Sequence, residues 1–219
     1  MASTMSPVQL EAALKQQAPG SLYLIVGEED LLRDSALAAI KRAALGSEGD
    51  EFNYELFYGD DASGTDIRNS VAVVPVFAER RVVVVKAAEK LTARESEPLL
   101  DSVNHPVDST TLVFVSPKLD GRLKFSQALA RAACMVDCSP LREAQLPSWI
   151  AREAERVGLR LEEAAAYVLQ EACGASLYGL RRELEKLASY VPANQAVTAA
   201  DVHLLRGMEP GASVFDLTL

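Results

Sequence analysis

The sequence predicts an α/β protein with a doubly wound, parallel, five-stranded sheet, followed by a small all-helical domain. Five short segments rich in apolar and β-branched residues alternate with helical patterns before residue 140. Strands that alternate with crossover helices form parallel sheets, and strands buried on both faces are apolar almost throughout. The five predicted strands are Leu22–Val26, Tyr54–Tyr58, Val82–Lys86, Thr111–Val115 and Cys134–Asp137.

The segments between these strands have helical periodicity. The first places Leu32, Ala36 and Ile40 on one face. Acidic residues stand at its start, Glu28 to Asp30, where the helix dipole favours them. Three further helices are predicted over Thr65–Val73, Thr92–Val103 and Arg122–Ala132.

After Pro140 no strand pattern returns, and we expect four helices. Leucines and a valine recur there at spacings of three and four, and Thr198 with Asp201 resembles a capping box. The predicted regions are a disordered tail (Met1–Pro7) and lead-in helix within 1–20, the α/β domain 21–140, the helical domain 141–209, and the start of a truncated C-terminal region, 210–219. The apolar stripe comprises Leu177, Leu180, Leu184, Leu187 and Val191.

Composition excludes several classes of function. The 219 residues are 49% hydrophobic and carry a net charge of −9, which argues against a dominant non-specific grip on DNA or anionic lipid. No apolar run approaches the length needed to span a membrane, so we expect a cytoplasmic protein.

The three cysteines predict a reducing compartment rather than a disulfide framework. Cys134 and Cys138 could form half of a metal site. However, the two histidines, His105 and His203, are distant and lack ligand spacing, so reduced core thiols are the favoured interpretation and no metal is expected.

A parallel α/β domain followed by a small helical domain is the arrangement of AAA+ ATPases, although fold alone does not define activity. A phosphate-binding loop after the first strand would read G-x-x-x-x-G-K-[ST]. Here Gly27 is present, but Leu32, Arg33 and Asp34 replace the second glycine, the lysine and the hydroxyl. Three carboxylates stand where an anion would bind, so we expect no nucleotide cofactor.

Other catalytic features are also lacking. The third strand ends in Lys86-Ala87-Ala88, without an acidic pair to hold Mg²⁺. Ser116 could be a polar sensor, but a plain loop residue is the favoured interpretation. Glu28, Glu29 and Asp30 could be imagined as a cation site, yet consecutive residues at a helix start point in different directions. No catalytic residue is therefore assigned.

With these segments placed, the chain from Ser21 to Leu219 resembles a known family, the delta subunit of the bacterial DNA polymerase III clamp loader. The resemblance lies in the order and spacing of several short motifs. These are Leu22–Glu29, Phe77–Lys86, Lys118–Asp120, Pro140-Leu141 with Trp149-Ile150, and Glu183–Tyr190.

The resemblance implies an AAA+ fold that binds no ATP and instead binds and opens the ring-shaped sliding clamp, the beta subunit. It also implies partners in a five-membered ring, gamma/tau and delta-prime, within a nucleotidyltransferase holoenzyme that contacts primed DNA only as a whole. A Leu-Phe pair of the family inserts into the clamp, and Val76 and Phe77 match it, with Pro75 and Val73 beside them. The slot of a phosphate-sensing arginine falls on Tyr178, with Arg181 and Arg182 one turn on.

The residues themselves agree with this assignment. Pro75 should end the preceding helix, which leaves Val76 and Phe77 in a connection flanked by charged Glu79, Arg80 and Arg81. An exposed aromatic within a charged rim is typical of a binding hot spot. The alternative is that Phe77 packs the turn onto the core.

Three other functions remain open at this point. One is an ATPase with an unorthodox site. Another is a nucleic-acid-binding module that uses Arg80, Arg81, Arg122 and Lys124. The third is a different inactive subunit such as delta-prime, although that partner usually carries zinc-binding cysteines, which this sequence lacks.

Overall fold

The computed structural model describes residues 4–46, 51–192 and 195–207. The chain divides into two compact units, Met1–Pro140 and Leu141–Leu219. Residues 1–3 of the predicted tail and the predicted C-terminal region 210–219 lie outside the described residues.

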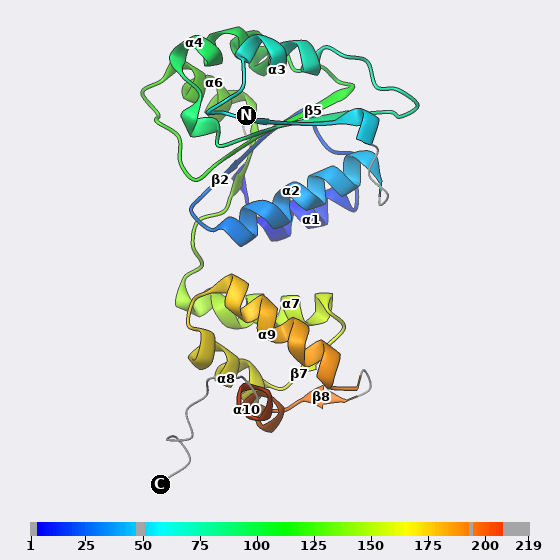
Figure 1. Ribbon diagram of the computed structural model, residues 1–219, viewed down its shortest axis with the longest axis vertical. Coiled ribbons are helices and arrows are strands. Elements are labelled where there is room, and N and C mark those ends of the chain that lie inside the picture. Colours follow the sequence, from blue (N-terminus) through cyan, green and yellow to red (C-terminus); the bar gives the residue numbers. More distant parts are fainter. Residues whose placement is uncertain (1–3, 47–50, 193–194, 208–219) are drawn as a thin grey trace. The chain divides into compact units, whose positions relative to one another are not determined.

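The first unit is built on a six-stranded sheet in which every neighbouring pair is parallel (Figure 1). The order of the strands is β1-β6-β2-β5-β4-β3. Their bounds are β1 Thr4–Met5, β2 Leu22–Val26, β3 Tyr54–Tyr58, β4 Arg81–Lys86, β5 Thr110–Ser116 and β6 Cys134–Asp137. The five predicted strands are confirmed, with β4 and β5 slightly longer than expected.

The sixth strand, β1, corrects the prediction of a disordered tail for Thr4 and Met5. These residues pair with Met135 and Val136 of β6. Without β1, the outer edge of β6 would present unpaired backbone groups, and a short segment can satisfy them whatever its side chains are. For that reason the strand has no apolar signature.

Helices cover both faces of this sheet, with α1 and α2 on one face and α3, α4 and α6 on the other (Figure 1). Alternate residues of each strand serve the two faces: Val83 and Val85 pack in a cluster with Phe114 and Phe125, and the intervening Val82 and Val84 point to the α2 side. All four valines are fully buried. The helices are α1 Pro7–Leu14, α2 Asp30–Leu45, α3 Gly64–Val71, α4 Ala93–Ser96, α5 Leu100–Asn104 and α6 Lys124–Ala132, with 3-10 turns η1 Glu51–Asn53, η2 Ala88–Lys90 and η3 Glu97–Leu99.

The predicted helix Thr92–Val103 is interrupted. It is divided into α4, η3 and α5, with Pro98 in the 3-10 turn between the two helices. Proline lacks an amide hydrogen and its ring clashes with the preceding turn, so a continuous α-helix cannot pass through this position.

The second unit contains the four predicted helices. They are α7 Leu146–Arg156, α8 Glu163–Cys173, α9 Leu177–Tyr190 and α10 Ala199–Gly207, preceded by the 3-10 turn η4 Glu143–Gln145. The predicted stripe along α9 is buried. The capping box is also present, since the Thr198 amide donates to Asp201 at 2.8 Å and the Asp201 amide to the Thr198 hydroxyl at 3.3 Å.

The prediction of an entirely helical second unit was wrong in one respect. Two short strands, β7 (Arg160–Leu161) and β8 (Ala196–Val197), pair in parallel. Each has only two residues, too few to give a periodic signal. They join the segments that follow α7 and precede α10.

Candidate protein-binding site

The turn between β2 and α2 is the place where an AAA+ fold would bind phosphate. Gly27 has φ +143°, and a Cβ at this position would lie 2.0 Å from the carbonyl carbon of Cys138. The Glu29 amide donates to the Cys138 carbonyl at 3.0 Å. This turn therefore packs against the backbone that follows β6, and two of its amides, those of Gly27 and Glu29, already donate to main-chain carbonyls.

Arg33 stands where a phosphate loop has lysine, and its guanidinium is turned back into this turn. It donates to the Gly27 carbonyl and pairs with Asp30, and its side chain is 13% exposed. Leu32 is buried in the core, and Asp34 pairs with Lys86 Nζ at 3.4 Å. The three side chains that differ from the phosphate-loop pattern, Leu32, Arg33 and Asp34, thus have partners within the protein.

Glu28, Glu29 and Asp30 place carboxyl groups at this turn, which oppose the binding of an anion. Burial raises the pKa of Glu29 above its ordinary value, and a backbone hydrogen bond with Leu31 opposes this shift in part.

Ser116, considered above as a sensor or a loop residue, is instead the fully buried last residue of β5. Its hydroxyl lies 2.9 Å from a carboxylate oxygen of Glu89.

The 72–80 loop, which connects α3 to β4, exposes a group of apolar side chains. Val73 is 45% exposed, Val76 is 48% and Phe77 is 106%. The alternative that Phe77 packs onto the core is therefore wrong. The helix α3 ends at Val71, earlier than predicted, so Pro75 lies inside the loop rather than at the helix end.

Phe77 also has an uncommon backbone conformation. Its φ is +56°, in the left-handed region. For a residue with a Cβ this region costs about 1–2 kcal/mol. Neighbouring contacts must hold the loop in this conformation.

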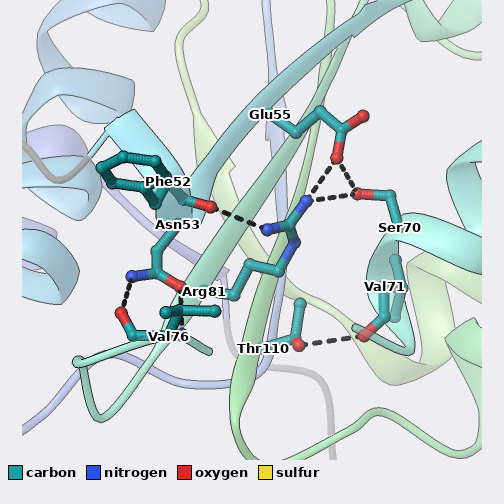
Figure 2. Close-up of polar contacts among 8 residues, drawn as sticks. All are labelled: Phe52, Asn53, Glu55, Ser70, Val71, Val76, Arg81 and Thr110. Carbon is teal, nitrogen blue, oxygen red and sulfur yellow. Dashed lines mark hydrogen bonds and ion pairs between the residues drawn. The ribbon is translucent and has the colours of Figure 1, made fainter. Parts of the chain in front are cut away.

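The loop is fastened on one side by Asn53, the last residue of η1, which is fully buried. The Val76 amide donates to Asn53 Oδ1 at 2.8 Å, and Asn53 Nδ2 donates to the Val76 carbonyl at 2.7 Å. Figure 2 shows the two bonds side by side. A single side chain therefore satisfies both polar groups of Val76.

Arg81, at the start of β4, fastens the base of the loop. Its guanidinium donates to the Phe52 carbonyl at 3.0 Å and also contacts Glu55 and Ser70 (Figure 2). The side chain is 9% exposed. The prediction that Arg81 belongs to a charged rim, or to a nucleic-acid surface, is therefore wrong, because its guanidinium is buried and bonded within the protein.

The other candidate cations lie apart from this network. Arg80 donates to the Thr111 hydroxyl at 3.3 Å, and Arg122 pairs with Asp120 on the surface. Lys124, the first residue of α6, is exposed. In the second unit, Tyr178 is half exposed and Arg181 pairs with the buried Glu153 at 2.5 Å.

Two residues near the loop were missed by sequence reasoning. Asn53 has no pattern that marks it, and Phe52 beside it is 83% exposed. Of the two, only Phe52 could have been noticed in the sequence, because it is a phenylalanine that fits neither a helical nor a strand periodicity. Over the described ranges the structure holds no cluster of His, Cys, Asp and Glu able to bind a metal, nor any helix long and apolar enough to cross a bilayer.

The parallel sheet, the helix that follows β2 after a short turn and the helical second unit define an AAA+-like fold. The Holliday junction branch migration motor RuvB of Thermotoga maritima shares this fold. Its structure superposes with a TM-score of 0.55 over 91% of this chain and 65% of the other, at 16% identity. More specifically, the chain belongs to the family of the DNA polymerase III delta subunit, whose family model matches residues 23–139.

Individual relatives agree with this family. The structure of the Bacillus subtilis DNA clamp loader delta protein has a TM-score of 0.73, at 22% identity, over 91% of this chain and 62% of that one. The DNA polymerase III delta subunit of Escherichia coli is 27% identical over 190 residues, which are 85% of this chain and 55% of the relative. The Bacillus subtilis delta subunit is 22% identical over 215 residues, 94% and 62% of the two lengths. The chain thus spans less than two thirds of these relatives.

Proposed function

We propose that this chain is the clamp-binding part of a clamp-loader delta subunit, and that it binds and opens a sliding clamp without binding or hydrolysing ATP. The observation that carries the proposal is the full exposure of Phe77 on a loop that Asn53 holds at Val76. Together with the exposed Val73 and Val76, this ring forms a group of apolar side chains of the kind that marks a protein-binding surface.

The apolar surface is large enough to act as an anchor. Burial of a Phe and a Val side chain contributes roughly 3–5 kcal/mol before the costs of association are subtracted. Opening requires a further condition: the chain must bind the open or strained ring more tightly than the closed one, because differential affinity is the only source of work. Val73 and Pro75 would line the edge of the contact.

The absence of a nucleotide role is part of the same proposal. Arg33 bonds back to the Gly27 carbonyl and Leu32 is buried, which leaves neither the lysine nor the glycine that a phosphate would need. ATP hydrolysis would then belong to neighbouring gamma/tau subunits of a cytoplasmic replisome, with delta-prime as a further partner, and DNA would be contacted only by the whole complex.

Binding to a purified bacterial sliding clamp, measured by surface plasmon resonance, tests the proposal. Val76→Ala/Phe77→Ala should weaken binding more than tenfold, which is about 1.4 kcal/mol or more. Tyr167→Ala is the matched control, since Tyr167 is 67% exposed on α8 and should not affect affinity. Unchanged affinity in a folded double variant would remove Val76 and Phe77 from the contact.

A further inference from the structure

We infer that Asn53 is a positioning residue for clamp binding: it holds the Val76 peptide so that Phe77 is presented in its exposed, left-handed conformation. This inference rests on the proposed function, because it concerns the same loop. It adds a buried residue, 23 positions earlier in the chain, that does not itself contact the partner.

The side-chain carboxamide of Asn53 fixes the backbone of Val76. Asn53 Oδ1 accepts from the Val76 amide and Nδ2 donates to the Val76 carbonyl, at 2.8 and 2.7 Å. A carboxamide that bonds both polar groups of one residue fixes the backbone on either side of it, as a neighbouring strand would. Rotation of the peptide that joins Val76 to Phe77 would break the bond from Nδ2.

The conformation of Phe77 carries the second step. Residues other than glycine, asparagine and aspartate rarely hold a positive φ unless the surroundings impose it. The ring of Phe77 is fully exposed and contributes no packing that could do so. The bonded backbone of Val76, directly before it, is therefore the restraint that the structure supplies on this side of the loop.

The anchoring of Asn53 carries the third step. Asn53 is fully buried, and the carbonyl of the preceding residue, Phe52, accepts from Arg81 at 3.0 Å. Arg81 is in turn bonded to Ser70 in the last turn of α3 (Figure 2). Asn53 is thus part of the sheet-bound framework, and the loop is fastened to it rather than the reverse.

A preorganised loop binds more tightly because it does not lose its conformational freedom on association. Asn53→Ala should therefore weaken clamp binding about tenfold, with the loss arising through Phe77. In the Val76→Ala/Phe77→Ala background, the same change should have almost no further effect on affinity. This non-additivity would not arise if Asn53 only stabilised the fold.

Hydrogen exchange provides a readout that needs no clamp. In Asn53→Ala the Val76 amide should exchange at least tenfold faster, whereas the Ala72 amide, bonded to Arg68 in α3, should keep its rate. Equal acceleration of both amides would mean general loosening and would overturn the positioning role. Unchanged exchange at Val76 would overturn it as well.

Asn53→Asp is the second variant, in case the alanine variant does not fold. It keeps an acceptor for the Val76 amide but replaces the donor to the carbonyl, so clamp binding should again weaken in a chain that melts cooperatively. Full affinity in Asn53→Asp, or additive losses in the combined variants, would refute the inference. If the unaltered chain does not bind a clamp, the proposed function fails, and the exchange measurement still decides whether Asn53 positions the loop.

Discussion

The guanidinium of Arg33 donates to the main-chain carbonyl of Gly27, six residues earlier in the chain. In a phosphate loop the side chain at this position extends toward the nucleotide and the backbone amides face it. Here the cation instead closes the turn on itself and is neutralised in part by Asp30. The turn is thus stabilised by its own residues.

A titration with a fluorescent ATP analogue should show no saturable binding to this chain at micromolar concentrations. Arg33→Lys should not create binding, because Leu32 still stands in place of the second glycine and Asp34 in place of the hydroxyl. An AAA+ ATPase with an intact loop, measured in the same buffer, is the positive control. Saturable micromolar binding by the unaltered chain would contradict the proposed division of labour.

Arg81→Ala should lower the free energy of unfolding by about 2 kcal/mol or more. The change removes a guanidinium that is 9% exposed, together with its hydrogen bonds to the Phe52 carbonyl and Ser70. Glu55, its ionic partner, is 42% exposed and still accepts from the Ser70 hydroxyl, so solvent and Ser70 reduce the cost of losing the ion pair. Urea unfolding followed by circular dichroism measures the difference.

Arg122→Ala is the matched control for that experiment. The Arg122 side chain is 90% exposed and pairs with Asp120 at the surface, so its loss should leave the free energy of unfolding almost unchanged. Equal effects of the two substitutions would contradict the structural role of Arg81.

The longer strands of the sheet could be predicted because buried strands consist of apolar and β-branched residues. Val82 to Val85 are fully buried on both faces of the sheet, and a run of β-branched residues has few other uses. By contrast, β1, β7 and β8 consist of two residues each, too few to show a period, even though Val197 of β8 is fully buried. No side-chain pattern could have revealed them.

The candidate site, too, could be predicted only in part. The position of Val76 and Phe77 between a helix and a strand could be inferred from apolar side chains that fit neither period. The partners that shape the loop could not, since Asn53 and Val76 are 23 residues apart and meet only through the fold. Arg81 was misread for a related reason: a charged residue at the start of a strand resembles a solvent-exposed one until Glu55 and Ser70 are placed beside it.

Cys138 should be the least reactive thiol of the chain, although it lies directly after β6 and beside the Gly27 turn. It is fully buried, and this burial, partly offset by the nearby Arg33 charge, raises its pKa to about 12. At pH 8 only ~10⁻⁴ of the thiol would then be ionised, and the thiolate is the reactive form. Cys134 and Cys173 are partly exposed.

Two single-cysteine variants test this expectation with a coloured disulfide reagent at pH 8. Cys134→Ser/Cys173→Ser retains Cys138 and should react at least a hundredfold more slowly than Cys138→Ala/Cys173→Ser, which retains Cys134. In guanidinium chloride the burial that raises the pKa is lost, so both variants should react at the same fast rate. Equal rates in the native proteins would mean that the Gly27 turn opens often enough to expose Cys138, and that the packing between this turn and the end of β6 is loose.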